Sequence, residues 1–487
     1  MNSPTRASRY IPFFLGPILF AVVQFALPAD FISPSAGKVL ALAAWMITWW
    51  VTEAVPIPVT SLLPLVLLPF LGVESMKNAA AAYAHPIIFL FMGGFMIALA
   101  LEKHRLHERI ALNLIRVTGT SGNGIILGFM IATASLSMWI SNTATAMMML
   151  PIALSVVRLL NTNKTLKPHE LSRNERNFAL GLLLMVGYAA TLGGLATIIG
   201  TPPNVVFAGL LDEFYETKLD FGKWMLMGVP ISAALLASTY IIITQILFPN
   251  RLKSVDGADE LIASKLKELG AITRAEKRVM LVFSITSFLW IFQHPLNTYL
   301  FRSEVLNDTN IAMGGGLLMF IVPDDFRELT FLLDWKDTIN LQWGILILFG
   351  GGLCLAGGLE KADVINTVGN WLARQGTFNI WLVAGLIVTT VVLSEFLSNV
   401  ALVQIFVPVI FGIADGLEVN PIFMALPITL SASIGFMFPI ATPPNAIVFS
   451  SGFIRMKDMI RAGMLLDLAS MLIILLASVT LVRWVYG

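Results

Sequence analysis

The segment "SNTATAMMMLPIA" runs from Ser141 to Ala153, and a second segment, "SNVALVQIFVPVI", runs from Ser398 to Ile410. Each places a Ser-Asn pair in the middle of a long apolar stretch, where neither residue is useful for packing. Each stretch is long enough for two short helices with a polar interruption between them. The pattern predicts two helical hairpins, over residues 123–160 and 379–413.

Composition identifies the surroundings of these hairpins. Of 487 residues, 57% are hydrophobic and only 13% are charged, and the mean hydropathy is +0.81. A soluble domain carries roughly a quarter charged residues, so this is a membrane protein. The net charge of +1 gives no reason to expect a nucleic-acid partner. Inside a membrane, an interrupted helix is tolerated only beside protein or water, which predicts that both hairpins are re-entrant.

The remaining apolar runs predict the crossing helices, because a helix needs about 20 apolar residues to span a bilayer. The predicted spans are 11–28, 38–54, 56–73, 86–101, 180–198, 225–248, 279–296, 309–323, 342–359, 421–440 and 459–485. We therefore predict an all-α polytopic membrane protein with about 11 transmembrane helices plus the two re-entrant hairpins.

Basic residues predict the orientation. Lys and Arg gather in 103–109, 164–176, 251–278 and 455–461, whereas the segment 211–220 is acidic. Eleven spans and two re-entrant hairpins place all the basic segments on one side, which the positive-inside rule makes cytoplasmic. The N-terminus is then cytoplasmic and the C-terminus lies outside.

Three motifs occur in the same order in both halves of the chain. The matching pairs are "FMGGFMIALALEK" (91–103) with "FGGGLCLAGGLEK" (349–361), "SLSMWISN" (135–142) with "VLSEFLSN" (392–399), and "GTPPN" (200–204) with "ATPPN" (441–445). The predicted topology runs the two copies in opposite directions, so the repeat is inverted. Inverted repeats with interrupted helices are typical of transporters whose substrate site lies where the repeats meet.

The motif residues offer neutral oxygen atoms. The serine pairs Ser137–Ser141 and Ser394–Ser398 have the spacing of one helix face, and an asparagine follows each pair. Hard cations prefer oxygen ligands, and a set without carboxylates suits a monovalent ion such as Na⁺. The alternative is that these residues only cap helices or mediate helix packing.

The paired prolines of each TPPN motif predict a broken helix, at 200–204 and at 441–445. Carbonyl groups around Gly200 and Ala441 would lose their helical partners and become available to cations. The alternative is an ordinary proline kink, which two copies in register make less attractive.

Carboxylates in apolar surroundings are functional candidates. Glu53 and Glu395 fit this description, although a structural role as hydrogen-bond anchors is favoured for both, and Asp467 is given no role. No Lys or Arg falls at either hairpin tip or TPPN motif. An anionic substrate there would be held by helix N-termini, amides, hydroxyls and co-bound cations.

The chain resembles the divalent anion/sodium symporter family of dicarboxylate, citrate and sulfate transporters. The resemblance extends over essentially the whole sequence. It rests on "WWVTEAVPIPVTSLLP" (49–64), "HPIIFLFMGGFMIALALEK" (85–103), "SNTATAMMMLPIA", "GTPPN", "SEFLSNVA" (394–401) and "ATPPNAIVFSSG" (441–452).

The resemblance implies a homodimer in which a transport domain moves like an elevator against a scaffold domain. It implies scaffold spans in 1–85, a first transport region in 86–222, scaffold spans with a cytoplasmic amphipathic segment in 223–341, a second transport region in 342–458 and a C-terminal span in 459–487.

The resemblance also implies residue roles. The first Na⁺ would contact Ser137, Ser141, Asn142 and Gly200, and the second Ser394, Leu397, Asn399 and Ala441. The substrate would meet Ser141, Asn142, Thr143, Thr201, Ser398, Asn399, Val400, Thr442 and Pro443. Two residues depart from the bacterial pattern. Val400 stands where threonine is frequent and cannot donate to a carboxylate, and Ser394 replaces a threonine but keeps the hydroxyl.

The function expected from this resemblance is Na⁺-coupled import of a di- or tricarboxylate of the succinate, malate and fumarate class, across the bacterial inner membrane. An anion exchanger of the same fold, or a member that prefers sulfate or citrate, is the alternative. An intramembrane enzyme is disfavoured, because the five histidines show no HExxH or other paired-ligand spacing. A channel is disfavoured because interrupted inverted repeats suit alternating access.

Overall fold

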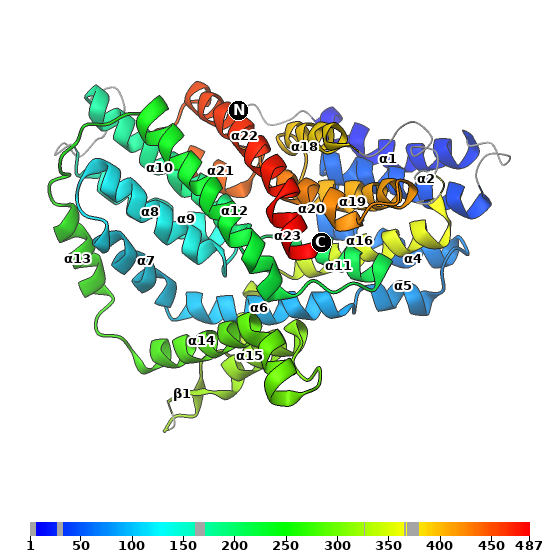
Figure 1. The fold of residues 1–487 in the computed structure, drawn as a ribbon, viewed down its shortest axis with the longest axis horizontal. Helices are drawn as coiled ribbons and strands as arrows, with labels where there is room; N and C mark the ends of the chain where they lie inside the picture. The colour runs from blue at the N-terminus through cyan, green and yellow to red at the C-terminus, as the bar shows by residue number, and fades with distance from the viewer. Residues whose placement is uncertain (1–5, 27–32, 161–170, 326, 365–366, 368–378) are drawn as a thin grey trace.

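The computed structural model describes residues 6–26, 33–160, 171–325, 327–364, 367 and 379–487, and it is built almost entirely of helices (Figure 1). The first half contains α1 (Arg6–Ala26), α2 (Pro34–Thr52), α3 (Ile57–Thr60), α4 (Leu63–Phe70), α5 (Met76–Ala82), α6 (Pro86–Lys103), α7 (Leu106–Val117), α8 (Gly122–Ser137), α9 (Asn142–Arg158), α10 (Arg173–Gly194) and α11 (Pro202–Tyr215). Residues 27–28 of the first predicted span and 164–170 of a predicted basic segment lie outside the described residues.

The rest of the chain contains α12 (Phe221–Ile241), η1 (Ile242–Leu247), α13 (Ala258–Glu268), α14 (Arg274–Pro295), η2 (Leu296–Phe301), α15 (Asp308–Ile321), η3 (Trp335–Asn340), α16 (Trp343–Lys361), α18 (Ile380–Ser394), α19 (Asn399–Gly416), α20 (Pro421–Ala432), α21 (Pro443–Phe449), α22 (Met456–Val479) and α23 (Leu481–Tyr486). Strand β1 (Pro323–Asp325) pairs antiparallel with β2 (Thr330–Phe331).

Seven helices in the described part of the chain are long and apolar enough to cross a membrane. Five shorter apolar helices accompany them, and these include α8 and α18, the first arms of the two predicted hairpins. Both hairpins therefore have the predicted form of two helices with a break at the Ser-Asn pair.

Two predicted spans are wrong in detail. The span 56–73 is two short helices, because Pro64 in the first turn of α4 has no N–H to continue the ladder from α3. The span 421–440 ends as a helix at Ala432, for a reason that lies at the second hairpin tip. The amphipathic helix α7 was not predicted, because its polar face interrupts the apolar run.

The two halves pack in the same pattern. Helix α10 packs against both arms of the first hairpin, α8 and α9, and α20 packs against both arms of the second, α18 and α19. Each half also reaches into the other, since α21 packs against α9 and α11 packs against α19. Helices α12 and α22, which follow the TPPN segments, pack against each other. The motifs of both halves are thereby brought into one helical assembly.

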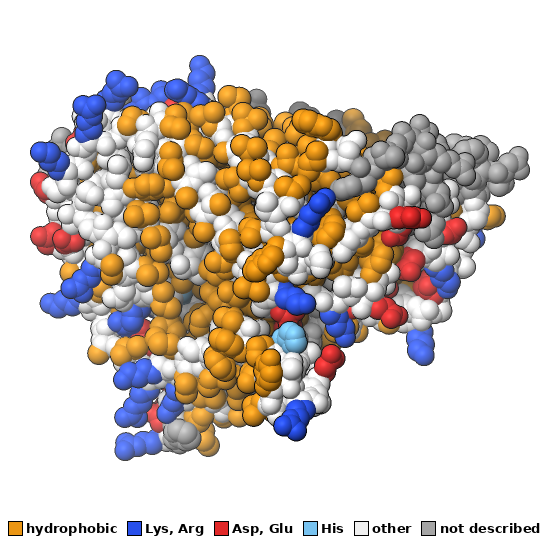
Figure 2. Space-filling model, viewed as in Figure 1, with side chains coloured by type: hydrophobic (Ala, Val, Ile, Leu, Met, Phe, Trp, Pro, Cys, Tyr) orange, Lys and Arg blue, Asp and Glu red, His pale blue; other side chains and the backbone are white. Residues whose placement is uncertain are grey.

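The surface has the character of a membrane protein. In Figure 2 hydrophobic side chains cover the middle of the visible face, and Lys and Arg gather at its left edge. The same edge in Figure 1 carries α13, which belongs to the segment 251–278 that the sequence marks as basic.

Candidate functional site

The break in the first hairpin lies between its two serines. Helix α8 ends at Ser137, and Ser141 is the N-cap of α9, where its hydroxyl accepts a hydrogen bond from the Ala144 N–H at 3.2 Å. In the second hairpin α18 ends at Ser394 and Ser398 caps α19 without a side-chain bond. The prediction that each serine pair lies on one helix face is therefore wrong, because the cap starts a new helix.

Oxygen atoms converge at the first tip. The Ser137 hydroxyl donates to the Ala190 carbonyl at 2.5 Å and lies 2.6 Å from the Asn142 amide oxygen. The same end of the Asn142 amide lies 3.0 Å from the Ala190 carbonyl and 3.2 Å from the Gly200 carbonyl. With nitrogen at this end, the amide donates to these acceptors. With oxygen there, the amide oxygen and the carbonyl oxygens of Ala190 and Gly200 face one another as acceptors beside the Ser137 hydroxyl, an arrangement that a cation would stabilise.

The convergence depends on Gly194, which lies outside every sequence motif described above. A Cβ atom on Gly194 would lie 2.6 Å from the Asn142 amide oxygen and 2.9 Å from the Gly200 carbonyl oxygen. Only glycine lets the end of α10 approach the tip this closely. The Ala190 carbonyl was also missed, because it lies inside a helix and no local motif marks it.

The second tip repeats part of this geometry. Ser394 donates to the Val391 carbonyl at 2.8 Å and also to the Ile434 carbonyl. A Cβ atom on Gly435 would lie 3.1 Å from the Ala441 Cβ and 3.4 Å from the Ser394 hydroxyl oxygen. The Asn399 amide oxygen is buried and has no hydrogen-bond partner. An unpaired buried acceptor of this kind fits a cation ligand.

Glu395 explains why α20 ends early. Its carboxylate is fully buried and accepts hydrogen bonds from the backbone N–H groups of Phe436, Met437 and Phe438, at 2.8, 3.0 and 3.2 Å. These N–H groups can no longer serve a helix, so the chain leaves α20 at Ala432. The arrangement corresponds to the structural interpretation of Glu395. Asp467 of α22 is buried beside this carboxylate.

The two TPPN segments break the chain in nearly the same conformation. Thr201 has φ −143° and ψ 140°, and Thr442 has φ −141° and ψ 149°. Helices α11 and α21 begin at the prolines that follow. With α9 and α19, four helices thus begin at the sequence motifs.

The other predicted residues have different surroundings. Thr201 and Thr442 are buried, Thr143 and Leu397 are half-buried, and Pro443 is exposed. The buried hydrophobic residues form two clusters, and Val400 packs against both of them. The smaller cluster includes Val39 and Leu42 of α2. Glu53 is exposed at the C-terminus of α2.

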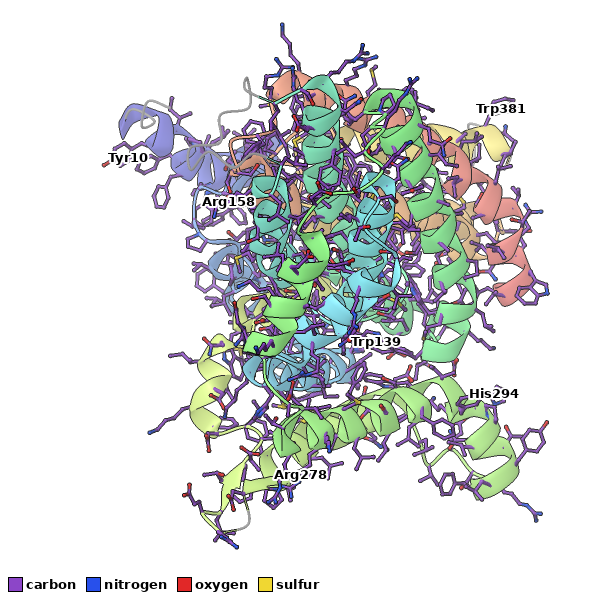
Figure 3. The ribbon with its side chains drawn as sticks, turned by 90° about the vertical axis from the view of Figure 1, so that its left-hand side faces the viewer. Tyr10, Trp139, Arg158, Arg278, His294 and Trp381 are labelled. Carbon is purple, nitrogen blue, oxygen red and sulfur yellow. The ribbon has the colours of Figure 1, made fainter. Side chains whose placement is uncertain are left out.

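The aromatic residues beside the two tips differ. Trp139 stacks with Phe221 and Trp290, with ring centroids 6.2 and 6.4 Å away, and it meets Phe283 edge-on at 5.1 Å. Figure 3 shows Trp139 between the first hairpin and α14. The equivalent Phe396 is 59% exposed and lies 5.4 Å from the ring of Phe438. The first tip is therefore packed against α14, whereas the corresponding face of the second tip is open.

A cavity of about 570 Å³ lies between α7, α9 and α13. It reaches Ile140 and Ala144, which flank the first Ser-Asn pair, and charged side chains such as Arg105 and Lys265 also line it. Burial lowers the pKa of His107 in its wall, although a bond to the Leu101 carbonyl opposes this shift.

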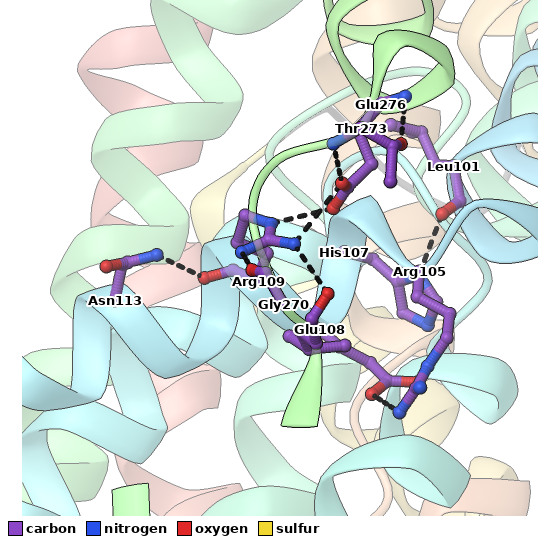
Figure 4. Close-up of polar contacts among 10 residues, drawn as sticks. Leu101, Arg105, His107, Glu108, Arg109, Asn113, Gly270, Thr273 and Glu276 are labelled. Carbon is purple, nitrogen blue, oxygen red and sulfur yellow. Dashed lines mark hydrogen bonds and ion pairs between the residues drawn. The ribbon is translucent and has the colours of Figure 1, made fainter. Parts of the chain in front are cut away.

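Ion pairs hold the wall of this cavity (Figure 4). Arg105 bonds Glu108 at 2.7 Å within α7. Arg109 bonds Glu276 at 2.7 Å and the Gly270 carbonyl at 3.0 Å. Glu276 also closes the capping box of α14 with Thr273. Helix α7 is thereby fixed to the connection between α13 and α14.

The chain is similar to known transport proteins. Residues 9–486 match the family model described as the sodium:sulfate symporter transmembrane region. The sodium-dependent dicarboxylate transporter SdcS of Staphylococcus saprophyticus is 39% identical, covering 100% of this chain and 94% of that protein. SdcS of Staphylococcus aureus strain USA300 is 37% identical, covering 98% of this chain and 91% of that protein.

Two solved structures share the fold. The Alcanivorax borkumensis YdaH transporter has a TM-score of 0.56 at 14% identity, covering 84% of this chain and 87% of that one. Neisseria gonorrhoeae MtrF, from a class of antimetabolite efflux pumps, has a TM-score of 0.57 at 9% identity, covering 95% and 97%. At these identities the likeness concerns the fold alone.

Proposed function

The chain belongs to the sodium:sulfate symporter family, whose members are membrane transport proteins rather than enzymes, and from this premise we propose that it imports a dicarboxylate together with Na⁺. The relatives named above are sodium-dependent dicarboxylate transporters, which supports both the ion and the substrate class. The proposed substrates are succinate, malate and fumarate.

The convergence of oxygen atoms at the first tip carries this proposal. Ser137, Asn142 and Gly200 supply three of the proposed ligands of the first Na⁺, and the Ala190 carbonyl joins them. Ser141 uses its hydroxyl to cap α9, so its contribution to the ion is the weakest of the proposed set. All these ligands are neutral oxygen atoms, which suits a monovalent hard cation.

The second Na⁺ is proposed to lie at the other tip. Its ligands are the Ser394 hydroxyl, the Leu397 carbonyl, the Asn399 amide oxygen and the Ala441 carbonyl. The unpaired Asn399 oxygen supports this assignment. The approach of Gly435 to both Ser394 and Ala441 supports a compact site.

The dicarboxylate is proposed to bind between these sites. Helices α9, α19, α11 and α21 all begin at the motifs, and helix N-termini favour anions. The proposed contacts are Ser141, Asn142, Thr143, Thr201, Ser398, Asn399, Val400, Thr442 and Pro443. Val400 contributes only apolar contact, because its side chain packs against hydrophobic neighbours and has no donor.

Transport is proposed to follow an elevator cycle in a homodimer. Regions 86–222 and 342–458 would form the transport domain, and 1–85, 223–341 and 459–487 the scaffold. The asymmetry of the hairpins supports alternating access, since α9 faces a cavity while α19 packs against α2 and α16. The proposed placement is the bacterial inner membrane with a cytoplasmic N-terminus.

Two bound Na⁺ ions have a consequence for energetics. Moving one charge across 100 mV takes about 2.3 kcal/mol, and the cell interior is negative. Two Na⁺ neutralise a dianion, so import would be driven by the sodium gradient without a contribution from the voltage. For import to gain more driving force than the sodium gradient supplies, a third cation or exchange for another anion would be needed.

Uptake of labelled succinate into proteoliposomes tests the proposal. An inward sodium gradient should accumulate succinate above the external concentration, and an equal choline gradient should not. Uptake that ignores sodium but requires an internal dicarboxylate would instead identify an exchanger.

A further inference from the structure

Two asparagines lie outside the sites described so far. Asn204 and Asn445 are the last residues of the two TPPN motifs, and both are fully buried. Neither is among the proposed cation or substrate ligands, so the reason for a buried amide at both positions has to come from its contacts.

The two amides make the same pair of hydrogen bonds. The Asn204 amide nitrogen donates to the carbonyls of Gly194 at 3.3 Å and Thr197 at 2.9 Å, which lie ten and seven residues earlier. The Asn445 amide nitrogen donates to the carbonyls of Gly435 at 2.9 Å and Phe438 at 3.2 Å, again ten and seven residues earlier. Each asparagine thus closes the loop that precedes its own helix, residues 195–201 before α11 and residues 433–442 before α21.

The closed loops carry the proposed cation ligands. Gly200 lies in the first loop and Ala441 in the second. One carbonyl that each amide holds belongs to a glycine, Gly194 or Gly435, that lies against the other proposed ligands. Gly194 abuts Asn142 and Gly200, and Gly435 abuts Ser394 and Ala441. We call the two hydrogen bonds made by each asparagine amide, Asn204 or Asn445, its clamp. Loss of a clamp would therefore move the loop relative to the proposed ligands on the hairpin.

The opposite end of each amide has no partner. The side-chain oxygens of Asn204 and Asn445 are both buried and unpaired. Buried acceptors without partners are unfavourable and rare. Because they occur at the same position in both halves, we attribute the presence of each asparagine to the two hydrogen bonds that its amide nitrogen donates.

The clamp is common to the two halves, whereas other ties to the loops differ. In the first half the Thr197 hydroxyl donates to the Met138 carbonyl at 2.6 Å. In the second half the Glu395 carboxylate binds three loop N–H groups. What both loops share in the proposed function is a carbonyl ligand for Na⁺.

We infer that Asn204 and Asn445 are positioning residues, each of which sets the sodium affinity of one site by holding the loop that carries Gly200 or Ala441. The inference rests on the proposed function and adds two residues that act through the backbone rather than on the ion.

Sodium titrations of the full-length protein test it. In Asn204→Ala and in Asn445→Ala, the sodium concentration for half-maximal succinate uptake should rise about tenfold, as expected for the loss of hydrogen bonds worth about 1.4 kcal/mol. The maximal rate at saturating sodium should change much less, because substrate contacts remain. Sodium-dependent thermal stabilisation of the purified variants, measured against choline, should shift in the same way.

Asn250→Ala is the matched control. Asn250 is also a buried asparagine, but its amide donates to Asn123 at 2.8 Å, near the start of α8 and away from both tips. Its loss should leave the sodium dependence unchanged. If Asn204→Ala does not fold, Asn204→Thr keeps a similar volume and one donor that is too short to reach both carbonyls, and it should show the same direction of change.

Double variants separate the two sites. Asn204→Ala and Asn142→Ala act on one proposed site, so their effects on sodium-dependent stabilisation should be non-additive. Asn204→Ala and Asn399→Ala act on different sites and should be close to additive. Unchanged sodium dependence in Asn204→Ala and Asn445→Ala would overturn the inference, even if Asn142→Ala and Asn399→Ala alter it. Sodium-independent transport by the unchanged protein would instead overturn the proposed function.

Discussion

The two Ser-Asn tips share a motif but are held in place by different chemistry. At the first tip the ties are neutral, because Thr197 bonds the Met138 carbonyl and Ser232 of α12 bonds the Leu192 carbonyl at 2.7 Å. At the second tip Glu395 replaces Met138 in the motif, and its carboxylate holds the loop. The same backbone break has therefore been stabilised once by hydroxyls and once by a buried charge.

The helices behind the loops differ in the same sense. Gly228 of α12 lies against the first loop, and Ser232 follows four residues later. Gly463 of α22 lies against the second loop, and Asp467 follows four residues later. The glycines serve the same close packing in both halves. The polar residues Ser232 and Asp467 differ in chemistry, so an internal repeat can preserve the geometry of a site while its electrostatics change.

Exchanging Glu395 for the first-half residue should have the largest effect. Glu395→Met removes three hydrogen bonds to a charged group, each worth about 1.5–3 kcal/mol, and leaves three N–H groups without their acceptor. We expect a loss of several kcal/mol in stability and of sodium-dependent transport, measured by thermal unfolding and uptake. Met138→Leu at the first tip should lose less than about 1.5 kcal/mol. Equal, mild effects would show that the tips are held alike.

The aromatic neighbours give the next effect. Trp139→Ala removes a ring that packs against Phe221, Trp290 and Phe283, and large-to-small changes at packed aromatics lose about 3–5 kcal/mol when fully buried. Trp139 is only half-buried, so the loss should fall below that range. Phe396→Ala should be nearly silent in the same unfolding measurement, because its ring is mostly exposed. The reverse order would mean that the second tip is the packed one.

The substrate contacts predict a smaller, specific effect. Thr143→Val removes a donor to the proposed carboxylate, a bond worth roughly 1.5–3 kcal/mol, so apparent dicarboxylate affinity should fall about 10- to 100-fold. Val400→Thr should do much less harm to this affinity, measured at saturating sodium. A silent Thr143→Val would remove Thr143 from the binding site.

Asp467 should give the smallest effect. Asp467→Asn keeps the volume beside Glu395 and removes a second buried carboxyl, while the three N–H bonds to Glu395 remain. Thermal stability should change by less than about 1 kcal/mol or rise slightly, because the asparagine amide stays polar beside Glu395 without placing a second carboxyl against it. A large loss of stability would mean that Asp467 itself carries the tie.

Local signals in the sequence predicted the breaks well. The paired prolines and the Ser-Asn pairs interrupt helices through their own backbone chemistry, and α8, α9, α11, α18, α19 and α21 all begin or end at them. The family resemblance implied that Ser137, Ser141, Asn142 and Gly200 lie together, and the structure places Asn142 within hydrogen-bonding distance of Ser137 and Gly200.

Contacts between segments that are distant in sequence could not be predicted from local motifs. The Ala190 carbonyl and Gly194 belong to a helix that carries no motif of its own. The end of α20 at Ala432 is set by Glu395, about 40 residues away in sequence, as its bond to the Phe436 N–H shows. A side chain that competes for backbone N–H groups leaves no trace in the apolar run that it shortens.

Each tip is proposed to bind one Na⁺ through its asparagine. The most direct test is the sodium concentration for half-maximal succinate uptake in Asn142→Ala and in Asn399→Ala, compared with the unchanged protein. Both variants should need more sodium, because each loses a coordinating oxygen. Sodium curves that coincide with that of the unchanged protein in both variants would contradict it.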